Sequence, residues 1–310
     1  MLLAPGVPAA IAQDEPTIKV DVSVVNILFN VRDKRGGLIG NLNKDDFTIF
    51  EDGKQQDIKY FNRETDLPLT IGLLIDVSAS QGNLIDIERN AAYQFFGSVL
   101  RKQDLAFLIS FGADAELLQD YTNSATLLRR GLEGLKVNSD VGGLHPGPVP
   151  TISQPRGTIL YDAVYLAASD QLKGQVGRKV LVLITDGEDQ GSRYKIAQAI
   201  ESAQRADAII YGFYYVDRAF YYGHGLVFGG VSDSELRRMA EETGGHVFHV
   251  DRKLTLQDAF SELQNEMRSQ YAIGYVPINA NKDGSFRRIE IKTNNKDWKV
   301  QARKGYYASK

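Results

Sequence analysis

Two carboxylates and three hydroxyls are spaced along the chain so that they could share one divalent cation. Asp76, Ser78 and Ser80 follow a long apolar run, Thr158 follows a glycine ahead of a helical segment, and Asp186 follows a second apolar run. Oxygen ligands with few carboxylates among them suit a hard cation such as Mg²⁺, Mn²⁺ or Ca²⁺. Taken singly, the serines could merely cap a helix and Asp186 could belong to a turn, so the interpretation depends on their convergence.

Two buried strands are the elements that must bring these residues together. Residues 69–75 and 179–185 are almost unbroken apolar runs, which are typical of parallel strands that are buried on both faces. Parallel strands of one sheet end at the same edge, and ligands bind there at the point where the chain reverses its winding direction. We therefore expect the five side chains to converge at the carboxyl edge of a sheet.

The rest of the middle region alternates between strand and helix patterns. Apolar spacing predicts helices over residues 87–100, 124–135, 159–172, 193–206, 233–243 and 256–270, and strands over residues 105–111, 115–121, 208–216 and 246–250. This alternation predicts an α/β fold with a doubly wound, mostly parallel sheet that carries helices on both faces.

Strand patterns flank this α/β region on both sides. Apolar and polar residues alternate over residues 18–24 before it and over residues 271–275 after it, and Gly53 suits a hairpin turn in the first flank. Neither flank has enough strands for a core of its own, so we predict one small β-sandwich built from both chain ends, with the α/β domain inserted into it. The predicted parts are a tail (1–16), the first sandwich part (17–66), the α/β domain (67–269) and the second sandwich part (270–310).

With these residues in place, the chain resembles the von Willebrand factor type A domains, the family that includes integrin I domains. The sequence DVSAS at residues 76–80 matches the DxSxS motif of the family, Thr158 matches the threonine of its second loop, and Asp186 matches the aspartate of its third loop. The flanking segments also look similar to bacterial proteins that contain a related domain, which indicates no activity. The resemblance covers about residues 67 to 269, and it implies a Rossmann-like fold with a metal-ion-dependent adhesion site made of Asp76, Ser78, Ser80, Thr158 and Asp186.

Two long loops are predicted to share the edge of the sheet with the metal, residues 138–157 and residues 217–231. The second loop is rich in aromatic side chains, which are favoured at protein interfaces because they bury a large area at a small entropic cost. Packing of these rings on the domain's own surface is the alternative. The candidate partner-binding residues of this loop are Phe220, Tyr221, Tyr222, His224 and Phe228.

The composition excludes several classes of function. With 36 basic and 39 acidic side chains among 310 residues, the net charge is −3, which gives no electrostatic reason to expect nucleic acid as a partner. The chain has no cysteine, so thiolate metal sites are excluded, and no apolar run is long enough for a transmembrane segment. Residues 1–16 fit the remnant of an export signal, with a disordered tail as the alternative, and they favour a secreted, periplasmic or cell-envelope protein.

The leading hypothesis from the sequence is a metal-dependent protein-binding module. A cation that is held mainly by neutral hydroxyls stays electrophilic, and the resemblance implies that an aspartate or glutamate of a protein partner completes its coordination shell. A structural subunit whose metal only rigidifies the loops is the alternative. A metal-dependent hydrolase is less favoured, because no HExxH motif or Ser–His pairing supplies a general base, and we expect no catalytic residues.

Overall fold

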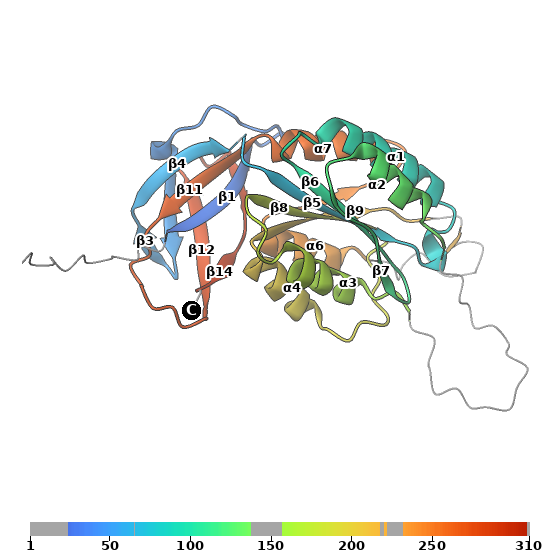
Figure 1. Cartoon of the computed structure of the whole chain (residues 1–310). Coiled ribbons are helices and arrows are strands. Elements are labelled where there is room, and N and C mark those ends of the chain that lie inside the picture. Colours follow the sequence, from blue (N-terminus) through green and yellow to red (C-terminus); the bar gives the residue numbers. More distant parts are fainter. Residues whose placement is uncertain (1–23, 65, 138–156, 218–219, 222–231, 309–310) are drawn as a thin grey trace, which may run out of the picture.

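The computed structural model describes residues 24–64, 66–137, 157–217, 220–221 and 232–308. The predicted N-terminal tail and nearly all of the predicted loop 138–157 lie outside these ranges. Figure 1 shows a central sheet between two layers of helices, joined to a β-sandwich whose strands come from both the blue and the red ends of the chain. Within the described ranges, no helix combines the length and the apolar character that a membrane span requires.

The central sheet has six strands in the spatial order β10-β9-β8-β5-β6-β7, and all neighbours are parallel except β6 and β7. Every residue of β5 and of β8 is buried, as the two apolar runs predicted. The strands are β5 (Leu69–Asp76), β6 (Leu105–Phe111), β7 (Ala115–Thr122), β8 (Arg178–Thr185), β9 (Ala208–Tyr214) and β10 (Val247–His249).

Helices cover both faces of this sheet, which confirms the doubly wound α/β prediction. One face is packed by α1 (Ile85–Val99), α2 (Ala125–Glu133) and α7 (Leu256–Met267). The other face is packed by α3 (Leu160–Leu166), α4 (Ile196–Arg205) and α6 (Ser234–Thr243), and α3 continues into a π-helical segment, Ala167–Leu172.

Two predicted helix boundaries are wrong for reasons that lie outside the local sequence. The helix predicted over 193–206 begins only at Ile196, because the carboxylate of Asp162 accepts hydrogen bonds from the amides of Arg193 and Tyr194 and fixes them in a turn. The helix predicted over 256–270 ends at Met267, because Gln270 already pairs with the edge strand of the sandwich. Long-range contacts decide both boundaries.

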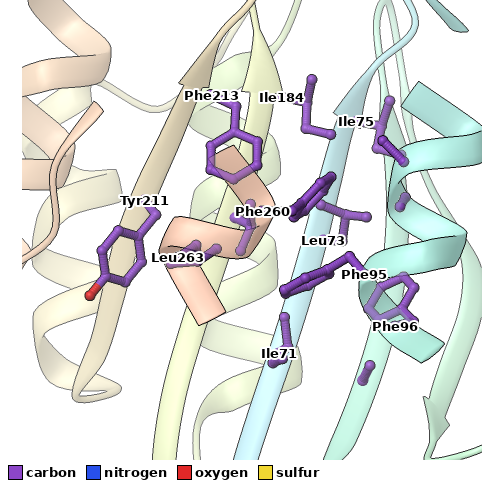
Figure 2. Packing of buried hydrophobic residues seen from close by; sticks show 14 of the residues in the cluster. Ile71, Leu73, Ile75, Phe95, Phe96, Ile184, Tyr211, Phe213, Phe260 and Leu263 are labelled. Atoms are coloured by element: carbon purple, nitrogen blue, oxygen red, sulfur yellow. The ribbon is translucent and has the colours of Figure 1, made fainter. Parts of the chain in front are cut away.

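Aromatic side chains fill the layer between the sheet and the helices α1 and α7. Phe260 of α7 stacks on Phe95 of α1 with ring centroids 4.4 Å apart, and it meets Phe213 of β9 edge-on at 4.7 Å. Figure 2 shows these rings beside the apolar side chains of β5. The last helix of the α/β domain is therefore packed into the main core.

The sandwich consists of two four-stranded antiparallel sheets, ordered β13-β1-β11-β4 and β14-β12-β2-β3. Both sheets combine strands from the two chain ends, as predicted from the flanks. The turn between β2 and β3 has positive φ angles at Asp52 (48°) and Gly53 (78°), which agrees with the predicted hairpin. The strands are β1 (Val25–Arg32), β2 (Phe47–Glu51), β3 (Lys54–Gln56), β4 (Ile58–Glu64), β11 (Gln270–Tyr275), β12 (Phe286–Thr293), β13 (Lys299–Ala302) and β14 (Gly305–Tyr307).

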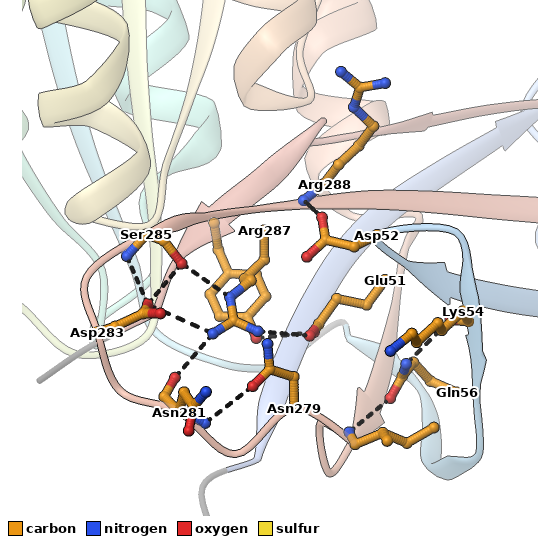
Figure 3. A network of polar contacts seen from close by, with 12 residues as sticks. Glu51, Asp52, Lys54, Gln56, Asn279, Asn281, Asp283, Ser285, Arg287 and Arg288 are labelled. Atoms are coloured by element: carbon orange, nitrogen blue, oxygen red, sulfur yellow. Dashed lines mark hydrogen bonds and ion pairs between the residues drawn. The ribbon is translucent and has the colours of Figure 1, made fainter.

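A buried polar network holds the two ends of the chain together inside the sandwich (Figure 3). The carboxylate of Glu51 accepts hydrogen bonds from the hydroxyls of Tyr275 (2.8 Å) and Tyr306 (2.9 Å). The buried guanidinium of Arg287 lies 3.6 Å from the same carboxylate, and it donates to the carbonyl oxygen of Asn281. These contacts join β2 of the first flank to β11, β12 and β14 of the second.

The shared core leads to a prediction about fragments of the chain. We expect a fragment of residues 67–269 to fold by itself, since it keeps both helix layers and the whole central sheet. Residues 1–66 alone should be largely unstructured, because their strands β1, β2 and β4 pair with β11 and β12. Two-dimensional NMR spectra of the two fragments test this, and well-dispersed signals from residues 1–66 would contradict it.

Candidate metal site

The candidate metal site lies where the central sheet reverses its direction of winding. The chain passes from β5 to β6 and β7 on one side, and then from β8 to β9 and β10 on the other, so that β5 and β8 become neighbours. Asp76 is the last residue of β5, and Asp186 follows the last residue of β8. The two aspartates are therefore placed at the carboxyl edge and at the switch point, as the sequence predicted.

Asp76 is completely buried and is held by hydrogen bonds to both of its carboxylate oxygens. One oxygen accepts from the backbone amide of Ser78 (2.9 Å), and the other accepts from the hydroxyl of Thr185 (2.6 Å). Burial raises the pKa of Asp76, and the nearby charge of Asp186 raises it further, although the hydrogen bonds from Thr185 and Ser78 act in the opposite direction. The surroundings of Asp76 therefore do not fully compensate its negative charge.

The two serines of the first loop connect to Asp186 through their hydroxyls. The oxygens of Ser78 and Ser80 lie 3.0 Å apart, and Ser80 donates to the carboxylate of Asp186 at 2.6 Å. Gly187 has a φ of 85°, a left-handed conformation that favours glycine and turns the chain directly after Asp186. The structure therefore brings Ser78, Ser80 and Asp186 into a continuous row of polar contacts.

Thr158 is also buried at this edge, just ahead of α3. Its carbonyl oxygen accepts hydrogen bonds from the amides of Gln190 (2.9 Å) and Gly191 (3.1 Å), which belong to the loop after Asp186. This pairing ties the second and third loops of the site together. Over the described ranges, no hydrogen bond joins the Thr158 hydroxyl to the other four candidate ligands.

The residues at this edge fit a divalent cation. A cation here would need hydroxyl oxygens among its ligands, because the described residues include no group of three or more histidine, aspartate or glutamate side chains that could hold a metal. Asp76 and Asp186 supply two carboxylates, and the raised pKa of Asp76 arises from burial and from the charge of Asp186, both of which a cation between them would counter. The donor set is all oxygen, which suits Mg²⁺, Mn²⁺ or Ca²⁺.

The acidic residue Asp189, three positions after Asp186, connects the loop after β8 to the start of α3. Its carboxylate accepts hydrogen bonds from the backbone amide of Tyr161 (3.1 Å) and from the hydroxyl of Ser192 (2.5 Å), at the start of α3. Burial raises the pKa of Glu188 and the charge of Asp186 raises it further, although a hydrogen bond from the backbone of Ser232 acts in the opposite direction. Asp189 therefore orients the segment that carries Thr158.

The aromatic loop after β9 begins beside this site. Tyr221 is buried, and its hydroxyl donates to the carboxylate of Asp186 at 2.8 Å, so this ring supports an aspartate of the site and is not presented to the solvent. Phe220 is partly exposed and meets Tyr221 edge-on, with ring centroids 5.6 Å apart. The other three predicted partner-binding residues, Tyr222, His224 and Phe228, lie outside the described residues.

Several polar residues of this region were missed by the sequence analysis. Thr185 donates to Asp76, and the position of this threonine at the end of an otherwise apolar run is the signal that could have identified it. Glu88 occupies a core-facing position of α1 and is completely buried, although its neighbours on that stripe are apolar. An acid within an apolar helical stripe is a signal of function, because it breaks the pattern that the fold requires.

One protein-family model matches part of the chain. Residues 151–262 match the family model described as the von Willebrand factor type A domain. This range includes Thr158 and Asp186 and begins after the first loop with Asp76. No curated protein matches the sequence of the chain.

Solved structures resemble this chain at low sequence identity. A von Willebrand factor type A protein from Catenulispora acidiphila is 12% identical, with a TM-score of 0.50, and the match covers 95% of this chain and 76% of that one. An aerotolerance-related membrane protein from Bacteroides fragilis is 16% identical, with a TM-score of 0.47 and coverage of 64% and 98%. Proximal thread matrix protein 1 from the mussel byssus, whose MIDAS motif is occupied by zinc, is 14% identical, with a TM-score of 0.49 and coverage of 69% and 48%.

Proposed function

We propose that this chain, which carries a von Willebrand factor type A domain, is a divalent-metal-dependent protein-binding module. The single observation that supports this proposal most is the row of contacts at the switch point, in which Ser78, Ser80 and Asp186 meet beside the buried Asp76. The proposed metal is Mg²⁺, with Mn²⁺ or Ca²⁺ as the other hard cations that such oxygens suit.

The proposed ligands explain why the metal would recognise a partner. Asp76, Ser78, Ser80, Thr158 and Asp186 would hold the ion, directly or through water, with only two negative charges among them. A divalent ion bound in this way keeps Lewis acidity, and it favours an additional anionic oxygen ligand. A glutamate or aspartate side chain of a protein partner supplies such a ligand.

The residues around the site support binding more than catalysis. Hydrolysis assisted by a metal needs a general base within hydrogen-bond reach of the attacking water. The acidic neighbour Asp189 already accepts hydrogen bonds at the start of α3, and Tyr221 donates to Asp186.

We propose that the chain acts in the cell envelope or outside the cell, because the apolar residues 1–12 resemble part of an export signal.

Capture of a partner in the presence and absence of metal tests the proposal. The immobilised wild-type chain, the variant Asp76→Asn and the control Asp114→Asn are each exposed to an envelope fraction, with Mg²⁺ or with a chelator. Asp114 is exposed at the same end of the sheet, and its side chain makes no hydrogen bond or ion pair with the other described residues.

We expect one set of proteins to be retained with Mg²⁺ by the wild-type chain and by Asp114→Asn, and to be released by the chelator. Asp76→Asn should retain none of this set. Equal retention under all conditions would contradict the proposal. Metal binding without any metal-dependent capture would favour the structural role instead.

A further inference from the structure

Glu88 is an acid in the middle of an apolar surface. It lies on α1, on the same buried stripe as Ile85, Ala92 and Phe95, and its exposed fraction is 0%. Neither of its carboxylate oxygens has a hydrogen-bond partner among the described residues. A buried carboxylate without a partner is costly for a fold, so its presence on this stripe requires a compensating group.

Gln81 is a second buried polar side chain without a hydrogen-bond partner among the described residues. It ends the short 3-10 turn, Ala79–Gln81, which includes the candidate ligand Ser80, and its exposed fraction is also 0%. Both its amide nitrogen and its amide oxygen are without a partner in the described part of the chain. Two unpartnered polar groups on one segment, directly after Ser78 and Ser80, indicate a common cause.

The backbone places Gln81 and Glu88 on the same side of the segment. The amide of Leu84 donates to the carbonyl of Gln81 (2.8 Å), and the amide of Glu88 donates to the carbonyl of Leu84 (3.0 Å), so the three residues occupy successive turns of one column. Side chains of a helix lean toward its N-terminus. Glu88 therefore leans toward Gln81 and toward the loop that carries Ser80.

The charges of the site also act on Glu88. Burial raises the pKa of Glu88 well above its usual value, and the charges of Asp76 and then of Asp186 raise it further. Glu88 is thus close enough to both aspartates to share their electrostatic environment. A cation between Asp76 and Asp186 would attract this third carboxylate as well.

We propose that Glu88 and Gln81 are positioning residues of the metal centre, which accept and donate hydrogen bonds to water that the metal carries on the α1 side of the site. The inference rests on the proposed metal site and extends it by two residues that do not coordinate the ion directly. Groups that bind metal-bound water orient it and strengthen the hold on the ion. The two side chains obtain their missing partners from this water.

Titration calorimetry with Mg²⁺ and with Mn²⁺ tests the proposal on the full chain. Glu88→Gln removes the charge and keeps the shape, and it should weaken metal binding by about 10- to 100-fold. Gln81→Met removes only the polar groups and should weaken binding in the same direction by a smaller factor. The electron paramagnetic resonance spectrum of bound Mn²⁺ should change in both variants, since it reports the symmetry of the coordination shell.

Glu266→Gln is the matched control, because Glu266 is equally buried but hydrogen-bonded at the opposite end of the sheet. It should lower thermal stability and leave the affinity for metal unchanged. Melting curves in chelator should place metal-free Glu88→Gln at or above the wild-type chain, since no partner of Glu88 is lost there. A variant Glu88→Gln that fails to fold, or that binds metal as tightly as the wild type, overturns the proposal. If the wild-type chain itself binds neither metal, the proposed function fails together with this inference.

Discussion

Replacement of Asp76 by asparagine is expected to abolish the binding of divalent metal and, at the same time, to stabilise the metal-free protein. The variant loses one of the two carboxylates that the site offers to a cation. It also removes a charge that is completely buried and that faces Asp186. Since asparagine has the same shape, it can still accept from the amide of Ser78 and contact the hydroxyl of Thr185.

The dependence of stability on pH follows from the raised pKa of Asp76. Burial and the charge of Asp186 raise this pKa from 3.8 to about 7 in the metal-free fold. The folded state then binds a proton that the unfolded state has already lost, so the free energy of unfolding decreases as the pH rises across this interval. Metal-free Asp76→Asn should lack this decrease and should be more stable than the wild-type chain at pH 7.

Calorimetry and chemical denaturation in chelator check both halves of this prediction. The wild-type chain and Asp114→Asn should show one metal site, and Asp76→Asn should show none. Metal binding by Asp76→Asn with wild-type affinity would remove Asp76 from the proposed ligands. A metal-free Asp76→Asn that is less stable than the wild type would show that the hydrogen bonds of Asp76 outweigh its desolvation.

The local sequence was sufficient to predict the sheet and four of the residues that meet at its edge. The apolar side chains over residues 69–75 and 179–185 point to both faces of a strand, so they are removed from water only when both faces are covered. Asp76 and Asp186 lie at the ends of these strands. Ser78 and Ser80 follow within one loop. Their positions are thus fixed by chain connectivity and by the direction of parallel strands.

The surroundings of the site could not be predicted in the same way, because they depend on contacts between distant segments. The contact of Tyr221 with Asp186 joins two loops that follow different strands. The sequence shows that a long loop contains an aromatic residue, but it does not show whether that residue faces a partner or the metal site. The beginning of α4 likewise depends on Asp162, which lies more than 30 residues earlier in the chain.

Among the substitutions considered, replacement of Glu266 by alanine is expected to lower the free energy of unfolding most, because this residue joins the α/β domain to the sandwich. Glu266 is fully buried near the end of α7, and its carboxylate lies 2.5 Å from the guanidinium of Arg32 in β1 and 2.5 Å from the amide nitrogen of Gln301 in β13. The hydroxyl of Tyr211 donates to it at 3.1 Å, and the ring nitrogen Nδ1 of His246 lies at 3.4 Å. Removal of one partner from a buried ion pair typically costs about 3–5 kcal/mol.

The pH dependence gives this prediction a second readout. Burial raises the pKa of Glu266, but His246, Arg32 and Gln301 outweigh burial, and the net pKa is lowered from 4.5. The unfolded state therefore binds the proton first, so the stabilisation by Glu266 is complete above pH 4.5 and is lost as the pH falls through the lower value of the folded state. Glu266→Gln should remove this part of the acid sensitivity.

The same contacts decide whether α7 can transmit movement from the metal site to the sandwich. A shift of α7 along its axis would separate Glu266 from Arg32 and Gln301, so we expect metal binding alone to leave the two parts of the wild-type chain in one arrangement.

Denaturation curves should place Glu266→Ala about 3–5 kcal/mol below the wild type. The control Glu133→Ala, which breaks only an exposed pair with Arg129, should cost less than about 1 kcal/mol. Spectroscopic distance probes on β12 and α2 should report no change with metal in the wild-type chain. Equal stability of the two variants, or a metal-dependent distance in the wild type, would show that Glu266 does not fix the junction.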